Sequence, residues 1–181
     1  MNRTSLPFTG DRAAPKKAPK WRPTAAWGGA ALALDLGTKA VSRCFLNSGE
    51  TLPVIKGFFN LTLVCNTGAA FSFLADEGGP GQSLKMTALA AVALMPFLYF
   101  FIQAAPGDRN RLAALGLILG GALGNIHDRL RWGAVVDFLD LHWRGHHWPA
   151  FNIADLAICL GAGLLGLSIW RAKPASTGGG G

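Results

Sequence analysis

The chain has 181 residues, of which 50% are hydrophobic and only 15% are charged, and its formal net charge is +7. Soluble domains carry about a quarter charged residues, so this composition favours a small integral membrane protein with one compact unit. The positive charge does not indicate nucleic-acid binding, because the sequence has a single tyrosine and no basic stripe interleaved with aromatic residues.

The two ends of the chain differ in composition from the rest. Residues 1–22 combine prolines with basic residues, which predicts a disordered basic tail. The apolar stretch that follows begins late and contains Asp35 and Lys39, so we do not expect a cleavable signal peptide. Residues 173–181 end in glycines and are expected to be flexible. The domain between these tails is predicted to span residues 23–172.

Four apolar segments of this domain predict four membrane-spanning helices, because about 20 apolar residues are enough to cross a bilayer. The segments are residues 27–41, 84–105, 112–126 and 151–170. The first is the weakest, because Asp35 and Lys39 interrupt it. These two residues are four positions apart, share a helix face and are expected to pair. The second contains Pro96, which membrane helices tolerate.

Two stretches between the helices are typical of β-strands. FFNLTLVCN (58–66) and WGAVVDFLDLHW (132–143) are rich in strand-forming residues. They fall in two regions between the helices, at about 44–80 and 132–149. An even number of helices places both termini on one side of the membrane, so these two regions share the other side.

The distribution of Lys and Arg predicts which side is cytoplasmic. The side that holds the termini carries ten of these residues: Arg3, Arg12, Lys16, Lys17, Lys20, Arg22, Arg109, Arg111, Arg171 and Lys173. The other side carries six over a longer stretch of chain: Arg43, Lys56, Lys85, Arg129, Arg131 and Arg144. Basic residues gather on the cytoplasmic side, so both termini are expected in the cytoplasm.

Several other residue types favour structural roles over chemical ones. Gly120 and Gly124 form a small-xxx-small pair, and Gly163 and Gly166 add further small positions, which indicates close helix packing. The cysteines have no metal-ligand spacing, and unpaired thiols are favoured over a Cys44–Cys65 bond. No metal is expected at the four histidines, because they lack a helical HExxH order and HWRGHHW suits an interfacial loop. These histidines are His127, His142, His146 and His147.

Two acidic residues fall at the outer membrane boundary, where a carboxylate is costly without partners. Asp137 follows the third helix and Asp155 opens the fourth. Two carboxylates held together share one proton and can perform acid–base catalysis on a water molecule. The alternative is that Asp155 and Asn152 only cap a helix and that Asp137 is a plain surface acid, as Asp140 is expected to be. Periodicity alone does not decide between these interpretations.

Four motifs in order make the chain resemble the bacterial lipoprotein signal peptidases, or signal peptidase II. They are DLGTK (35–39), NTGAAFSFL (66–74), GGALGNIHDRLRWGAVVDFLDLHW (120–143) and PAFNIADLAICLGA (149–162). The resemblance extends over nearly all of residues 27–170. Each motif alone would be weak, but all four in this order on a four-helix chain are specific.

The resemblance implies an aspartyl intramembrane endopeptidase without a cofactor or metal. The expected fold is an all-α membrane protein of four transmembrane helices with a small extracytoplasmic β-cradle. The expected substrates are lipid-modified prolipoproteins, cut just before the diacylglyceryl-modified cysteine. The family's catalytic pair falls on Asp137 and Asp155. Substrate-binding positions fall on Asn66, Asn125, Arg129 and Asn152, and structural polar positions on Asp35, Lys39 and Asp128.

The resemblance also sets expectations about the cell. The protein is expected as a monomer in the bacterial inner membrane, in contact with membrane lipids. The loop after Phe71 is expected to close over the substrate, with Gly78, Gly79 and Gly81 as places to bend. His127 departs from the family pattern, and the N-terminal extension is longer than the family needs. The alternatives are a non-enzymatic four-helix transporter or assembly factor, and a peptidase that cuts other membrane peptides.

Overall fold

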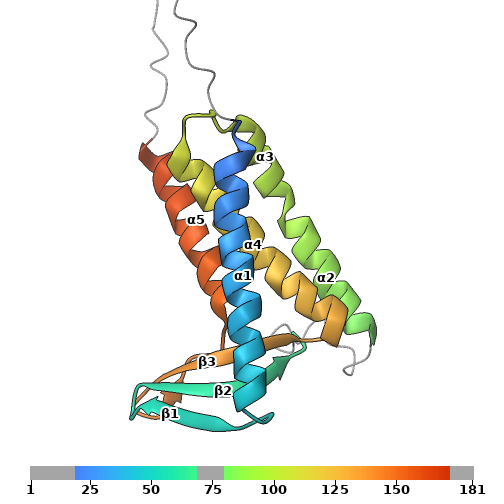
Figure 1. Cartoon of the computed structure of the whole chain (residues 1–181), viewed down its shortest axis with the longest axis vertical. Coiled ribbons are helices and arrows are strands. Elements are labelled where there is room, and N and C mark those ends of the chain that lie inside the picture. The colour runs from blue at the N-terminus through green and yellow to red at the C-terminus, as the bar shows by residue number, and fades with distance from the viewer. Residues whose placement is uncertain (1–18, 69–79, 172–181) are drawn as a thin grey trace, which may run out of the picture.

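The structure, a computed structural model, describes residues 19–68 and 80–171. The helices stand side by side, and a small sheet lies across one end of them (Figure 1). The helices are α1 Trp21–Phe45, α2 Pro80–Ala93, α3 Met95–Gln103, α4 Arg109–Trp132 and α5 Ile153–Arg171. The strands are β1 Thr51–Ile55, β2 Phe59–Asn66, β3 Val135–Trp143 and β4 His146–His147. A helical bundle with a small antiparallel sheet is therefore confirmed.

The first helix is longer than predicted at both ends. It begins at Trp21, inside the predicted disordered tail 1–22, so that boundary is wrong. Pro23 lies in the first turn, where a missing N–H costs no helical hydrogen bond. Asp35 and Lys39 do not interrupt the helix, because Lys39 Nζ lies 2.7 Å from Asp35 Oδ2. This ion pair was predicted and is confirmed.

The second predicted helix is divided in two. The break lies at Leu94, whose N–H donates to the Ala91 carbonyl at 3.1 Å in a tighter turn than that of an α-helix. Pro96 lies two residues further on and has no N–H to continue the ladder. Leu98 N–H returns to the Leu94 carbonyl at 3.3 Å. The segment 84–105 is thus helical, but it is not one continuous helix.

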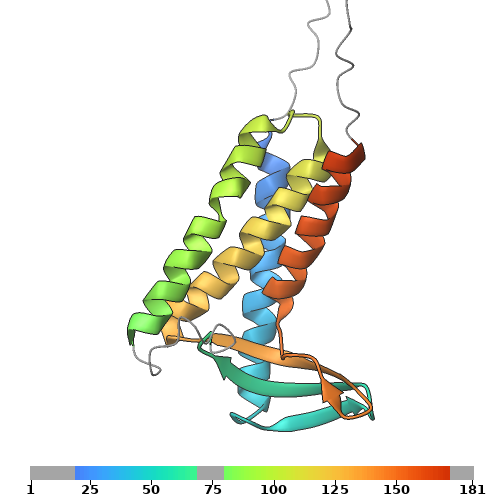
Figure 2. The ribbon, with the colours of Figure 1, turned by 180° about the vertical axis from the view of Figure 1, so that it is seen from behind.

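Helix α4 is packed between α1 and α5, and glycines allow the close approach (Figures 1 and 2). A Cβ on Gly120 would collide with the carbonyl of Gly28 on α1. A Cβ on Gly121 would collide with the carbonyl of Ala154 on α5. The packing role of Gly120 and Gly124 is confirmed. The prediction for Gly163 and Gly166 is wrong, because neither has an atom within 4 Å of its Cβ position, and Gly161 meets α4 instead.

The sheet is antiparallel, with the strand order β1-β2-β3-β4. Both predicted strands are confirmed, and they pair with each other as β2 and β3. Gly133 ends α4 with φ of 73°, a left-handed conformation that glycine adopts without strain, and β3 starts two residues later. Among the described residues, all three cysteines are free, as favoured.

Two helical segments are long and apolar enough to cross a membrane: Leu84–Gln103 and Ile153–Arg171. The first covers most of α2 and all of α3, and the second is α5. Helices α1 and α4 are of similar or greater length but carry charged residues within their span. The expected loop after Phe71 lies outside the described residues, apart from Gly81, which lies within α2 and not in a bend.

Candidate active site

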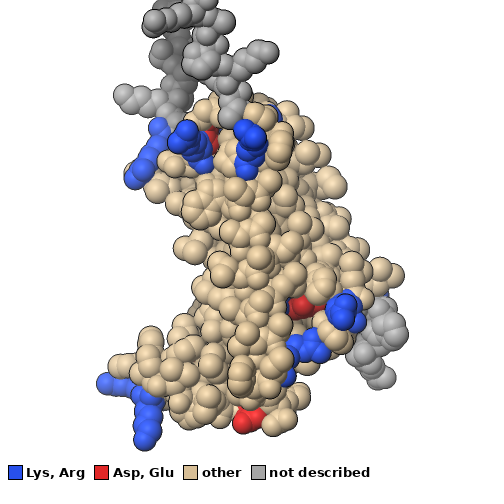
Figure 3. Space-filling model, viewed as in Figure 1, with Lys and Arg blue, Asp and Glu red and all other residues tan. Residues whose placement is uncertain are grey.

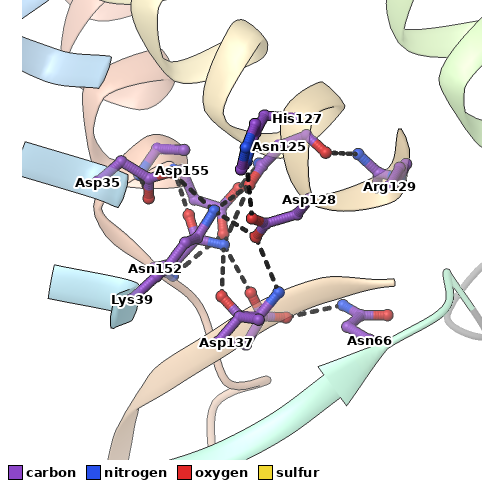
Figure 4. A network of polar contacts seen from close by, with 12 residues as sticks. Asp35, Lys39, Asn66, Asn125, His127, Asp128, Arg129, Asp137, Asn152 and Asp155 are labelled. Carbon is purple, nitrogen blue, oxygen red and sulfur yellow. Dashed lines mark hydrogen bonds and ion pairs between the residues drawn. The ribbon is translucent and has the colours of Figure 1, made fainter. Parts of the chain in front are cut away.

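The predicted site residues meet where the helix bundle faces the sheet (Figure 4). Helices α1, α4 and α5 each contribute side chains, and strands β2 and β3 approach from the sheet. One continuous network of hydrogen bonds and ion pairs joins the whole predicted set. Its members are Asp35, Lys39, Asn66, Asn125, Asp128, Arg129, Asp137, Asn152 and Asp155. Residues that are up to 120 positions apart in the sequence are thereby placed in one cluster.

Asp137 lies on β3 and is 2% exposed. The side-chain amide of Asn152 donates to its Oδ1 at 2.7 Å, and that of Asn66, on β2, donates to its Oδ2 at 2.9 Å. Asn66 is held in turn, because its Oδ1 accepts from the Gly68 N–H at 2.8 Å. Both carboxyl oxygens are therefore oriented by neutral amides, and Asp137 is not a plain surface acid.

Asp155 is tied to the N-terminus of α5 by a reciprocal cap. Asn152 N–H donates to Asp155 Oδ2 at 3.2 Å, and Asp155 N–H donates to Asn152 Oδ1 at 3.0 Å. This is the arrangement of a capping box. The capping alternative for these two residues is thus correct as geometry. It does not exclude chemistry, because the same Asn152 side chain also contacts Asp137.

Asn125 completes the bridge between the two acids. Its amide donates to Asp155 Oδ1 at 2.8 Å, and its Oδ1 accepts from Asn152 Nδ2 at 3.2 Å. Asn125 and Asn152 are 9% and 0% exposed, so both are fixed in the interior. The two amides hold the carboxyl groups of Asp137 and Asp155 toward the same region. This juxtaposition is what periodicity alone could not provide.

A second group of charges lies directly beside this pair. Lys39 Nζ contacts Asp35 Oδ2 at 2.7 Å and Asp128 Oδ2 at 2.9 Å, and it donates to Asn125 Oδ1 at 3.0 Å. Asp35 Oδ1 accepts from the Ala154 N–H at 2.8 Å, and Asp128 Oδ2 accepts from the Val136 N–H at 3.1 Å. These carboxylates therefore join α1 and α4 to the starts of α5 and β3.

Arg129 and His127 lie at the edge of the network. Arg129 is half-buried, bonds the Asn125 carbonyl at 3.4 Å and interacts electrostatically with Asp155 and Asp137. His127 is exposed, and its Nδ1 lies 3.5 Å from Asp128 Oδ1. The departure from the family pattern at His127 therefore touches Asp128 and not the acid pair.

The electrostatics of Asp137 suit proton transfer. The pKa of Asp137 is raised from 3.8 to about 6, chiefly by burial and also by the charge of Asp155, against the lowering effect of the Asn66 and Asn152 hydrogen bonds. Two facing carboxyl groups titrate as a pair, so the shared proton belongs to both. Below about pH 6, such a pair can hold one proton and one negative charge.

Asp140 corrects an expectation. It was predicted to be a plain surface acid, but it is 7% exposed and accepts from Asn60 Nδ2 at 2.7 Å. His147 Nδ1 lies 2.8 Å from its Oδ1. Asp140 lies three residues after Asp137, and alternation along β3 places it on the opposite face of the strand. No motif or spacing indicates that Asn60 and His147 contact Asp140 on that face.

Comparison with known proteins assigns the chain to a family. Residues 29–171 match the family described as signal peptidase (SPase) II. The lipoprotein signal peptidase of Syntrophotalea carbinolica is 46% identical over 77% of this chain and 86% of its own. That of Ralstonia nicotianae is 52% identical over 73% of this chain and 75% of its own. A solved bacterial membrane enzyme superposes with a TM-score of 0.71 at 30% identity, over 82% of this chain and 93% of its own. The chain therefore belongs to the signal peptidase II family.

Proposed function

We propose that Asp137 and Asp155 form the catalytic pair of an aspartic endopeptidase that cuts lipid-modified prolipoproteins just before the lipidated cysteine. Removal of lipoprotein signal peptides is the function that family membership carries to this chain. The observation that supports the proposed pair is the contact of one buried residue, Asn152, with both carboxyl groups: its side-chain amide donates to Asp137 and its backbone N–H donates to Asp155.

In the proposed mechanism, the ionised member of the pair takes a proton from a water molecule, whose oxygen attacks the scissile carbonyl carbon. The protonated member donates its proton to the carbonyl oxygen as the tetrahedral intermediate forms. The carbon–nitrogen bond then breaks as the leaving amine takes the proton that came from the water, while a hydroxyl of the intermediate gives its proton to the other carboxylate, so that a carboxyl group forms on the signal peptide and the pair again holds one proton. The released products are the signal peptide and the lipid-bearing chain with a free amino group.

The surrounding polar residues take three kinds of role in this proposal. Asn125 and Asn152 fix the orientation of the acids, since both donate to them from buried positions. Asn66 and Arg129 are half-buried at the edge of the site and are assigned to the substrate backbone. Asp35, Lys39 and Asp128 hold the helices and the strand together.

The proposed membrane domain, expected over residues 23–172, begins with α1 at Trp21, and its four transmembrane segments are formed by α1, by α2 with α3, by α4 and by α5. Helices α1 and α4 have 25 and 24 residues, or roughly 36 Å at 1.5 Å per residue, enough to cross a hydrocarbon core of about 30 Å. Figure 3 supports this arrangement, because Lys and Arg lie near the two ends of the visible face and a band without charges lies between them. Within the helices, Asp35 and Lys39 are buried and paired.

The proposed lipid contact rests on the outer surface of α2 and α3. Large apolar side chains there are 47% to 68% exposed: Leu84, Leu89, Val92, Met95, Leu98 and Ile102. A surface of this kind is favourable against lipid tails and unfavourable in water. We place the protein in the bacterial inner membrane as a monomer, with both termini in the cytoplasm and the sheet on the outer side.

A cleavage assay tests the function. Purified protein is incubated with a diacylglyceryl-modified prolipoprotein, and the released signal peptide is measured by mass spectrometry. We expect a single cut before the lipidated cysteine. Equal cleavage of the same peptide without the lipid would favour a peptidase for other membrane peptides. No cleavage of either would favour a transporter or assembly factor.

The orientation is tested by a reporter fused to the C-terminus that is active only outside the cytoplasm. We expect no signal from this fusion. The same reporter inserted in the β1–β2 turn, next to Lys56, should be active. A strong signal from the C-terminal fusion would reverse the orientation and place the site on the cytoplasmic side.

A further inference from the structure

A cluster of metal-ligating side chains lies on the sheet, outside the acid pair and its network. Asp140, His142 and His147 each offer one ligand atom, and these atoms all lie within 4.8 Å of one another. In the described residues this is the group that could hold a metal ion. The mechanism proposed above uses none of the three.

The sheet register explains why these residues meet. His142 on β3 and His147 on β4 are directly opposite each other in the antiparallel pair. Their rings stack, with centroids 4.8 Å apart and an interplanar angle of 13°. Asp140 is two residues before His142 and so points to the same face of β3. HWRGHHW (142–148) was expected to be an interfacial loop without a metal, but its histidines lie on β3 and β4, and the strand geometry brings together one carboxylate and two imidazoles.

The carboxylate is already fixed for ligation. Asn60 on β2 is opposite Asp140 in the register, and its amide donates to Asp140 Oδ2 at 2.7 Å. Asp140 is 7% exposed, whereas the His147 side chain is 55% exposed. Hydrogen bonds of this kind orient a side chain that binds a metal. The site thus has a carboxylate held by Asn60 and an exposed imidazole, His147, whose Nδ1 already lies 2.8 Å from Asp140 Oδ1.

We propose that Asp140, His142 and His147 bind one divalent transition-metal ion of the Zn²⁺ class on the outer face of the sheet. Two imidazoles and one carboxylate are a ligand set that Zn²⁺ accepts, with the remaining position open to water. Metal–ligand distances of about 2.0–2.2 Å require the ligand atoms, which lie within 4.8 Å of one another, to rearrange around the ion. Imidazole ligands select such ions over Mg²⁺ and Ca²⁺.

The bound ion would connect the two segments that lead to the acid pair. Asp140 follows Asp137 by three residues on β3, and His147 precedes Asn152 by five. Trp148 N–H already donates to the Leu141 carbonyl at 2.8 Å, so the hairpin is closed at this point. The ion would link β3 and β4 through their side chains as well.

Binding is tested on the full-length protein in nanodiscs by titrating Zn²⁺ against a chromophoric chelator. We expect one Zn²⁺ per chain and a gain in thermal stability, since a ligand that binds the folded state stabilises it. His142→Gln and His147→Gln should each weaken binding by at least about tenfold, and Asn60→Ala by about tenfold, because Asn60 holds the Asp140 carboxylate in place. The matched controls His146→Gln and His127→Gln should bind like the wild type.

A second measurement uses Cu²⁺ as the probe. Its electron paramagnetic resonance spectrum should show nitrogen couplings from both imidazoles, and His147→Gln, which is at an exposed position and is expected to fold, should lose one of them. The proposal is overturned if wild-type protein binds Zn²⁺ no more tightly than the His142→Gln/His147→Gln double variant. It is equally overturned if His146→Gln weakens binding as much as His147→Gln does.

Discussion

Two carboxylate clusters lie side by side in this protein and are stabilised differently. In the first, Lys39 contacts both Asp35 and Asp128 at 2.7 and 2.9 Å, so a buried positive charge balances buried negative ones. In the second, Asp137 and Asp155 accept hydrogen bonds from the neutral side-chain amides of Asn152 and Asn125. In the first arrangement a lysine ammonium lies against the carboxylates, whereas in the second neutral amides hold the acids and the pKa of Asp137 is raised.

The difference separates structure from function within one network. A buried ion pair is costly to break, because removing one partner leaves an uncompensated charge. An amide-held acid can instead be replaced by its amide without leaving a buried charge. The two clusters should therefore respond in opposite ways to isosteric substitution, and the following experiments use that contrast.

The largest expected effect is on catalysis. Asp137→Asn and Asp155→Asn should each lower kcat by at least about 10³-fold, because Asn cannot transfer protons yet nearly matches Asp in shape. Both variants should insert, fold and bind substrate. The double variant should be hardly worse than either single variant, since residues that act as a unit are strongly non-additive. Release of signal peptide from a lipidated prolipoprotein measures the effect.

The matched control for this experiment is Asp140→Asn, which changes the same residue type on the same strand but on its opposite face. It should keep most of the activity. Near-normal cleavage by either variant of the pair, together with an inactive Asp140→Asn, would show that the wrong carboxylates were chosen.

The next effect is on stability, in the first cluster. Lys39→Met leaves Asp35 and Asp128 without their cation and should destabilise the protein by about 3–5 kcal/mol. Thermal unfolding in detergent, followed by circular dichroism, measures the change. Arg109→Met, which removes an exposed cation from α4, should change stability by less than about 0.5 kcal/mol. An unchanged Tm for Lys39→Met would contradict a structural role for this cluster.

Substitution in the second cluster should change stability in the opposite direction and stabilise the protein. The pKa of Asp137 is raised from 3.8 to about 6, so folding favours its protonated form. The stability from this group is fully present below pH 3.8 and is lost as the pH rises to about 6. At 1.36 kcal/mol per pH unit, the loss at neutral pH is about 3 kcal/mol. Asp137→Asn should therefore raise the Tm at pH 8 and flatten the decline between pH 4 and 6. A lower Tm at pH 8 would contradict this.

The same raised pKa predicts a pH dependence of cleavage. The pair is active with one shared proton, so kcat/KM should fall as the pH rises above about 6, where Asp137 loses that proton. The falling limb is measured from initial rates across pH 5–9 with a substrate that has no ionisable group near the scissile bond. A rate that stays constant from pH 5 to pH 9 would argue against a shared proton.

The smallest expected effects lie at the edge of the site. Asn66→Ala removes one of the hydrogen bonds to Asp137, and Arg129→Ala removes a nearby positive charge. Each should lower turnover by about tenfold, the equivalent of about 1.4 kcal/mol, and leave expression and Tm nearly unchanged. Failure of either variant to fold would give that residue a structural role instead.

Much of this arrangement could be predicted from the sequence, because the motifs carry local information. Every residue that the sequence analysis assigned to the site lies in one of the four motifs and belongs to the network in Figure 4. The apolar lengths and the strand-forming stretches locate the helices and the two main strands. The contacts that join these elements are between residues far apart in the sequence, and no periodicity or spacing predicts them.

The errors show the same limit. Helix α5 is apolar around its whole circumference, so its sequence could not show that Gly161, and not Gly163 or Gly166, faces α4. Asp140 was predicted at the surface because the register that places Asn60 and His147 over it depends on two other strands. The break at Leu94 depends on the local backbone geometry around Pro96, which cannot be predicted from the apolar composition of the segment.

The position of Lys39 has a consequence for biogenesis. Asp35 and Lys39 are one turn apart on α1, so their ion pair can close within that helix before any later segment has been synthesised. In the proposed topology, the first segment thus enters the bilayer with its two central charges already neutralised by each other. Asp128 is made 89 residues after Lys39 and joins the pair only when α4 arrives. The ion pair that neutralises the charges of α1 during insertion then binds Asp128 when α4 packs against α1.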